Sequence, residues 1–126
     1  MFDIDADLTI HLTRGDIANL DVGAKVDGTD DYMFRVGDIV RINVFVKGQH
    51  DNIVLTKDVP VLVEASVISI FLSSEDTKIG DIINKPADYW YEVELNPDAM
   101  SQTIIGYDKK GPKVFRLYPE GDDNNG

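Results

Sequence analysis

The sequence predicts an all-β domain of the antiparallel sandwich type, with about seven to nine strands and one short helical turn. Three observations favour this fold. Apolar and polar residues alternate with a period of two in short runs. Turn sequences rich in glycine, asparagine and aspartate separate these runs at even spacing. Only one segment carries the signals of a helix.

The alternating runs place apolar side chains on one face, as a half-buried strand requires. The expected strands are residues 8–12, 20–24, 40–47, 53–56, 68–72, 89–95, 103–107 and 113–117. The turn sequences between them are residues 14–16, 27–31, 48–52, 96–98 and 110–112. A sandwich and a barrel give the same alternation, so both alternatives stay open at this point.

Residues 73–80 predict one or two turns of helix, because serine stands at the N-cap, acidic residues follow it and glycine ends the segment. We expect one sandwich domain over residues 1–119 and a disordered acidic tail over residues 120–126. The first residues lack the basic region and apolar run of a signal peptide, and no stretch approaches the roughly 20 apolar residues of a membrane span. No membrane partner is therefore expected.

The charge balance limits the partners. Lysine and arginine number 12 against 23 acidic residues, which gives a net charge of -11. Such a surface repels phosphate backbones, so nucleic-acid binding is disfavoured, whereas a basic protein partner or cations remain compatible. The chain has no cysteine, which excludes disulfides, thiolate metal sites and cysteine nucleophiles.

Three segments carry a resemblance to a known family: residues 8–16, residues 36–44, and residues 72–77 followed by 88–95. They are a strand leading into Arg-Gly-Asp, a long strand with an outward arginine, and a short turn before a tyrosine-rich strand. In this order, over roughly residues 7–118, they resemble the N-terminal domain of the phage baseplate upper protein family, from tailed phages of Gram-positive bacteria. The resemblance implies an immunoglobulin-like β-sandwich with a structural role in a tail or baseplate, made in the bacterial cytoplasm and then carried in the virion.

The resemblance offers no catalytic residues, and residues 79–87 form a longer connection than the family leads us to expect. An analogy at the level of the fold also supports the predicted sandwich. Residues 73–77 followed by 88–91 resemble the corner before strand F of immunoglobulin domains, where a tyrosine bonds back to the turn.

The catalytic inventory is thin. His11 and His50 have no serine or carboxylate at a spacing that suggests a triad. Glu92 and Glu94 share a strand face roughly 7 Å apart, but surface acids are the commoner explanation. We therefore expect neither enzymatic activity nor a cofactor.

Two acidic motifs have ordinary structural explanations. Arg14-Gly15-Asp16 matches an integrin-binding tripeptide but is more simply a turn between two strands. Asp3, Asp5 and Asp7 share one side of an extended strand, and with three aspartates at 27, 30 and 31 they offer calcium ligands. The loop glycine and the bidentate glutamate of a calcium site are absent, so a solvated acidic edge is favoured and no metal site is expected.

The function predicted is a non-catalytic structural or assembly module of a tailed phage or prophage, which docks to other tail or baseplate proteins or to a second copy of itself. Trp90 should point outward while Tyr89 and Tyr91 face the core, and Trp90, Phe45 and Arg41 are the candidate contact residues. The alternative is a carbohydrate- or calcium-binding module on the same fold.

Overall fold

The computed structural model describes residues 1–26 and 30–120, which form eleven strands and no helix. The strands are β1 (Phe2–Ile4), β2 (Ile10–Thr13), β3 (Ala18–Val22), β4 (Lys25–Val26), β5 (Asp30–Asp31), β6 (Ile39–Val46), β7 (Ile53–Pro60), β8 (Ile68–Leu72), β9 (Ala87–Leu95), β10 (Gln102–Ile105) and β11 (Lys113–Tyr118). The prediction of an all-β fold is confirmed. Within the described ranges the chain forms no helix that could cross a membrane.

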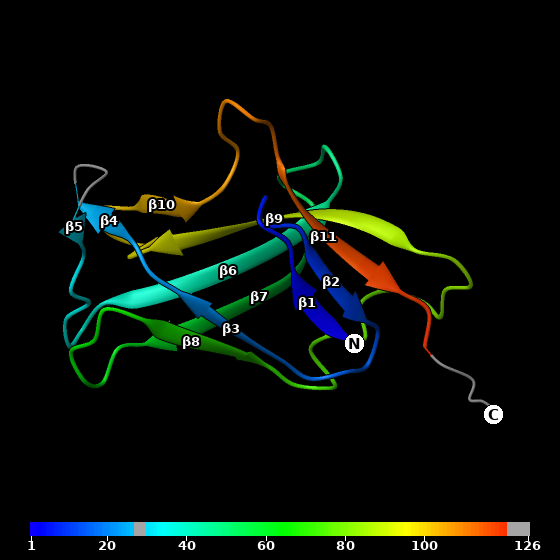
Figure 1. Ribbon diagram of the computed structural model, residues 1–126, viewed down its shortest axis with the longest axis horizontal. Coiled ribbons are helices and arrows are strands. Elements are labelled where there is room, and N and C mark those ends of the chain that lie inside the picture. Colours follow the sequence, from blue (N-terminus) through cyan, green and yellow to red (C-terminus); the bar gives the residue numbers. More distant parts are fainter. Residues whose placement is uncertain (27–29, 121–126) are drawn as a thin grey trace.

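The strands form two main layers. A seven-stranded sheet has the order β1-β2-β11-β9-β6-β7, with β10 beside the second half of β9. The antiparallel pair β3-β8 makes the second layer and crosses the large sheet (Figure 1). The path of the large sheet ends at β1 and β7 and does not close, so the two layers form a sandwich.

The order of the central strands is similar to that of an immunoglobulin variable domain. β3 and β8 take the places of strands B and E, and β11-β9-β6-β7 take those of G-F-C-C′. Two details of the predicted strands and sheets were wrong. The described residues form more strands than the seven to nine expected, because β1, β4 and β5 are too short to show alternation. The large sheet is mixed, since β2 runs parallel to β11.

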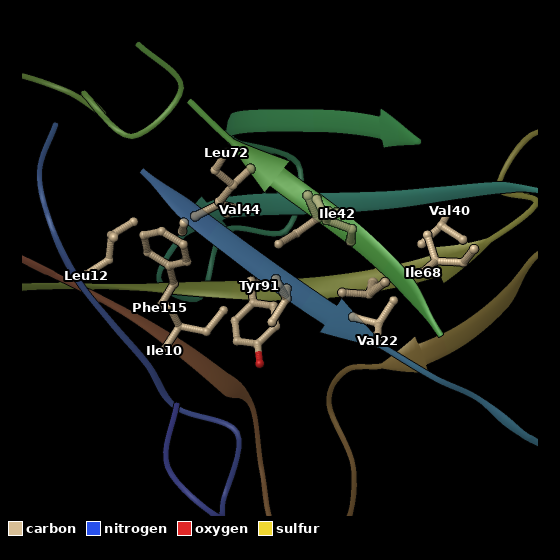
Figure 2. Close-up of a cluster of buried hydrophobic side chains, with 14 of the residues drawn as sticks. Ile10, Leu12, Val22, Val40, Ile42, Val44, Ile68, Leu72, Tyr91 and Phe115 are labelled. Atoms are coloured by element: carbon tan, nitrogen blue, oxygen red, sulfur yellow. The ribbon is translucent and has the colours of Figure 1, made fainter. Parts of the chain in front are cut away.

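The core lies between the two layers. Side chains from β3 and β8 face those of β6 and β9 in Figure 2, and the inward residues of β6 are fully buried. Tyr91 is 2% exposed, and burial raises the pKa of its hydroxyl. That hydroxyl donates a 2.6 Å hydrogen bond to the carbonyl of Leu8, so it does not bond back to residues 73–77 as the analogy predicted.

The predicted helical turn over residues 73–80 is wrong. The N-cap signal is present, because the amide of Asp76 donates to Ser73 Oγ and the amide of Ser73 donates to Asp76 Oδ2. The segment is nevertheless only a turn. Thr77 is fully buried and its hydroxyl donates to the carbonyl of Asp16, which ties the turn to the β2–β3 loop. Gly80 then takes a φ of 65° and redirects the chain.

The predicted tail starts at a residue with a defined place. Glu120 accepts a 2.6 Å hydrogen bond from Arg14, so it belongs to the folded domain. Residues 121–126, the rest of the predicted tail, lie outside the described residues.

Candidate binding site on the outer sheet face

Phe45 and Trp90 are direct neighbours on the outer face of the large sheet. They are paired in the register of β6 and β9, and their chain neighbours Val44 and Tyr91 point into the core. Phe45 is only 5% exposed because the ring of His50 lies edge-on to it at 4.8 Å. Two of the three candidate contact residues therefore meet, and one of them offers little accessible surface.

Two loops build walls around this pair. His50 lies in the β6–β7 turn, and Tyr107 lies in the loop between β10 and β11; both loops rise on the same side of the molecule in Figure 1. The rings of Trp90 and Tyr107 stand 6.1 Å apart at an angle of 68°. Trp90 is half-buried, whereas Tyr107 is 73% exposed.

The rings and loops enclose a cavity of about 330 Å³, which we call the outer-face hollow. Its lining residues include Phe45, His50, Trp90, Glu92, Tyr107 and Lys113. The hollow is therefore a concave site with aromatic walls and a few charged groups, which is the usual composition of a small-molecule site.

The charged groups of the hollow are paired. His50 Nε2 lies 2.8 Å from Glu92 Oε1, and Lys113 Nζ lies 2.8 Å from Asp108 Oδ2. Lys113 is almost completely buried, so its ammonium is held against the wall. The hollow therefore presents one acidic group, Glu92, which lies beside the ring of His50. It also presents one basic group, Lys113, which lies beside the carboxylate of Asp108.

A polar row continues from the hollow across the sheet. Partial burial, and then the charge of Glu92, raise the pKa of Glu94. Glu94 accepts hydrogen bonds from Asn43 Nδ2 and Ser101 Oγ, both at 3.3 Å, and Thr56 donates to Asn43 Oδ1 at 2.7 Å. Carboxylate, amide and hydroxyl groups thus lie next to the aromatic walls.

Arg41 lies apart from this site, four residues before Phe45 on β6. Its guanidinium bonds both oxygens of Asp58, at 2.6 and 2.9 Å, and Asp98 Oδ2 at 3.1 Å. These carboxylates raise the pKa of Arg41. The role of Trp90, Phe45 and Arg41 as one contact surface stays a prediction, and the structure places only the first two together.

Sequence reasoning missed Tyr107 and Lys113 and took His50 for an isolated turn residue. It also missed a chain of contacts nearer the β1 edge of the same sheet, where His11 Nδ1 lies 2.7 Å from the hydroxyl of Tyr118 and His11 Nε2 lies 2.7 Å from Asp5 Oδ2. The only signal for these groups was the outward position of His11 on its strand. No local sequence pattern predicts the loop conformations that bring His50, Tyr107 and Lys113 together.

The Arg-Gly-Asp motif forms the expected turn between β2 and β3. The expectation that the three aspartates share one extended strand is wrong, because β1 ends at Ile4 and the amide of Leu8 donates to the carbonyl of Asp5 in a turn. Arg14 is buried and donates to the carbonyls of Ile79 and Gly80, so its guanidinium is inaccessible to a receptor. Asp5 pairs with His11, whereas Asp7 accepts from the amide of Thr9. In the described ranges no group of three or more acidic or histidine side chains is arranged to hold a metal ion, and position 27 of the proposed calcium set lies outside them.

No protein-family model, curated protein or solved structure matches this chain. The resemblance to phage baseplate upper proteins therefore depends on the three sequence markers. In the fold these markers are β2 with the turn after it, β6 with its lead-in, and the turn at 73–77 with β9.

Proposed function

We propose that this protein is a non-catalytic structural or assembly module of a tailed phage or prophage, which docks to other tail or baseplate proteins or to a second copy of itself. The resemblance supports the phage context. The observation that carries the docking role is a group of exposed apolar side chains at one end of the sandwich.

Three connections lie at this end, on the left in Figure 1: the β5–β6 and β7–β8 loops and the β9–β10 turn. The first two are joined by backbone hydrogen bonds between Phe34 and Ala65. Their exposed apolar residues, together with one from the turn, form what we call the apolar end: Met33 (52% exposed), Val36 (67%), Leu62 (77%), Val63 (75%) and Met100 (89%). Exposed apolar groups gathered on a soluble domain are typical of protein contact surfaces.

A partly buried polar network holds the apolar end in place. Asp38 accepts hydrogen bonds from the hydroxyl of Tyr32, the amide of Arg35 and the side chain of Asn96. Asn96 in turn accepts from the amide of Ile39. A surface that is already ordered loses less conformational entropy when a partner binds, which favours docking.

The free edge of the large sheet is a weaker candidate. Among the described strands β7 pairs only with β6, which leaves its other edge open. Lys57, Asp58 and Pro60 lie on this strand, and charged residues and proline on an edge oppose the addition of another strand. Docking through the apolar end is therefore favoured over strand addition.

The first test is peptide mass spectrometry on gradient-purified particles from an induced culture of the source strain. We expect this chain at a stoichiometric level relative to known tail proteins. Intact particles without it would refute the role of structural component.

The second test uses the double variant Leu62→Asp/Val63→Asp, which places charge on the apolar end. We expect incorporation into particles, or self-association in solution, to fall at least ten-fold. Ile82→Asp is the matched control, because Ile82 is 81% exposed but lies in a different loop. Trp90→Ala tests the contact residues predicted from sequence; unchanged assembly would remove them from the docking surface.

A further inference from the structure

We infer that the outer-face hollow binds a neutral sugar ring, a hexopyranose unit of a glycan. This inference does not depend on the proposed function, because it concerns a different surface. It is carried by the juxtaposition of the Trp90 and Tyr107 rings with Glu92, His50 and Lys113 around one cavity.

The aromatic walls suit the apolar side of a sugar. The faces of Trp90 and Tyr107 are electron-rich, and the C–H groups on one side of a pyranose ring are weakly positive, so the two attract each other. Their angle of 68° makes a corner that contacts a ring on two sides. Tyr107 leaves 73% of its surface in water, and a ligand stacked against it would cover that area.

The polar groups suit hydroxyls. A hydroxyl both donates and accepts, so it bonds a carboxylate, an ammonium or an imidazole. Glu92 supplies an acceptor, Lys113 supplies a donor, and His50 is bonded to Glu92 at 2.8 Å. Hydroxyls around a sugar ring can bond all three without desolvating an unpaired charge.

The same charges argue against other ligand classes. Glu92 is already bonded to His50 and Lys113 to Asp108, so the hollow offers no unpaired ammonium to a phosphate or uronate and no unpaired carboxylate to an amine. The net charge of -11 further disfavours anions. An apolar side chain of a protein partner would bury Glu92 and Lys113 without offering them hydrogen bonds, which is costly. A neutral polyol with one apolar face is the class that remains.

The size of the hollow limits how much of a glycan it holds. Ligand pockets run from about 300 to 1,000 Å³, so a cavity of about 330 Å³ is small and suits one ring. A longer glycan would continue over the polar row at Glu94 and Asn43. Affinity for a single ring should be in the millimolar range, since so few contacts must offset the entropy of association.

The experiment is saturation-transfer NMR on the full chain with four probes: the methyl glycosides of glucose, galactose, rhamnose and N-acetylglucosamine. We expect transfer to the ring C–H protons of at least one probe, and a shift in the fluorescence of Trp90, the single tryptophan. Glucuronate and choline are the charged comparators. Absence of transfer to all four glycosides, or tighter binding of either comparator, would overturn the inference.

Variants then locate the site. Tyr107→Ala and Glu92→Gln should each weaken binding of the responding glycoside at least ten-fold. Phe71→Ala is the matched control, because Phe71 is an aromatic residue 49% exposed on β8 in the opposite layer, and its loss should change nothing. Tyr107 makes few buried contacts, and one-dimensional proton spectra verify that each variant is folded. Full binding in both site variants would refute the assignment to the hollow.

Discussion

Asp38 shows how one side chain can order several segments. Its two oxygens receive donors from Tyr32, Arg35 and Asn96, which belong to two different connections at the apolar end. Partial burial alone would raise the pKa of Asp38, but these hydrogen bonds outweigh it and the pKa is lowered. The charged form is therefore the one that the fold stabilises.

This gives a prediction for pH dependence. Because the pKa of Asp38 is lower in the folded state, its stabilisation is present above about pH 4 and is lost as pH falls through the folded-state value. We expect Asp38→Asn to reduce the free energy of unfolding by about 1 kcal/mol at pH 7, with the difference shrinking as the pH falls below the ordinary aspartate value of about 4. Urea unfolding at neutral and at low pH measures it. Asp51→Asn, in an exposed turn, is the control, and an equal loss at low pH would contradict the assignment.

The sequence pattern predicted the long central strands well but did not predict the full length of the edge strand. Alternation gave β6 and β9 within two residues of their ends, because each has one face in the core. β7 extends to Pro60, four residues beyond its prediction, because side chains on an edge strand are largely exposed and carry no apolar pattern. The outward positions of Phe45 and Trp90 could be predicted, but their pairing depends on which strands are neighbours. Tyr107 lies at the hollow because of the path of an irregular loop, and no periodic pattern in the sequence predicts such a path.

The buried hydroxyl of Thr77 is one of the links that tie the turn at 73–77 to the β2–β3 loop. Thr77 Oγ1 donates to the carbonyl of Asp16 at 2.7 Å and accepts from the amide of Gly15 at 3.1 Å. Thr77→Val keeps the shape but leaves both backbone groups without this partner, which should lower the free energy of unfolding by about 2 to 3 kcal/mol. Thermal and urea unfolding measure the change, and Thr77→Ser, which keeps the hydroxyl, is the matched control. If the valine variant were as stable as the serine variant, the hydroxyl would have no such role.

In the whole molecule, the two proposed surfaces lie at opposite ends of β6. The apolar end adjoins Ile39, where β6 begins, and the hollow contains Phe45, near its last residue. Eight residues of strand span roughly 26 Å. A partner on the apolar end would therefore leave the hollow open, so docking and sugar binding can be measured independently.

The parallel pairing of β2 with β11 has a mechanical consequence. A force applied to the two chain ends would first peel β1 from β2, because antiparallel strands loaded at one end separate one pair at a time. It would then pull β2 and β11 from opposite ends of a parallel pair, in which Ile10 to Thr13 face Phe115 to Tyr118. All of these hydrogen bonds would bear the load together in shear. Single-molecule pulling should record a weak early step followed by a stronger one, and a domain of this kind would resist tension along its chain better than the roughly 5–15 kcal/mol of unfolding free energy typical of single domains implies.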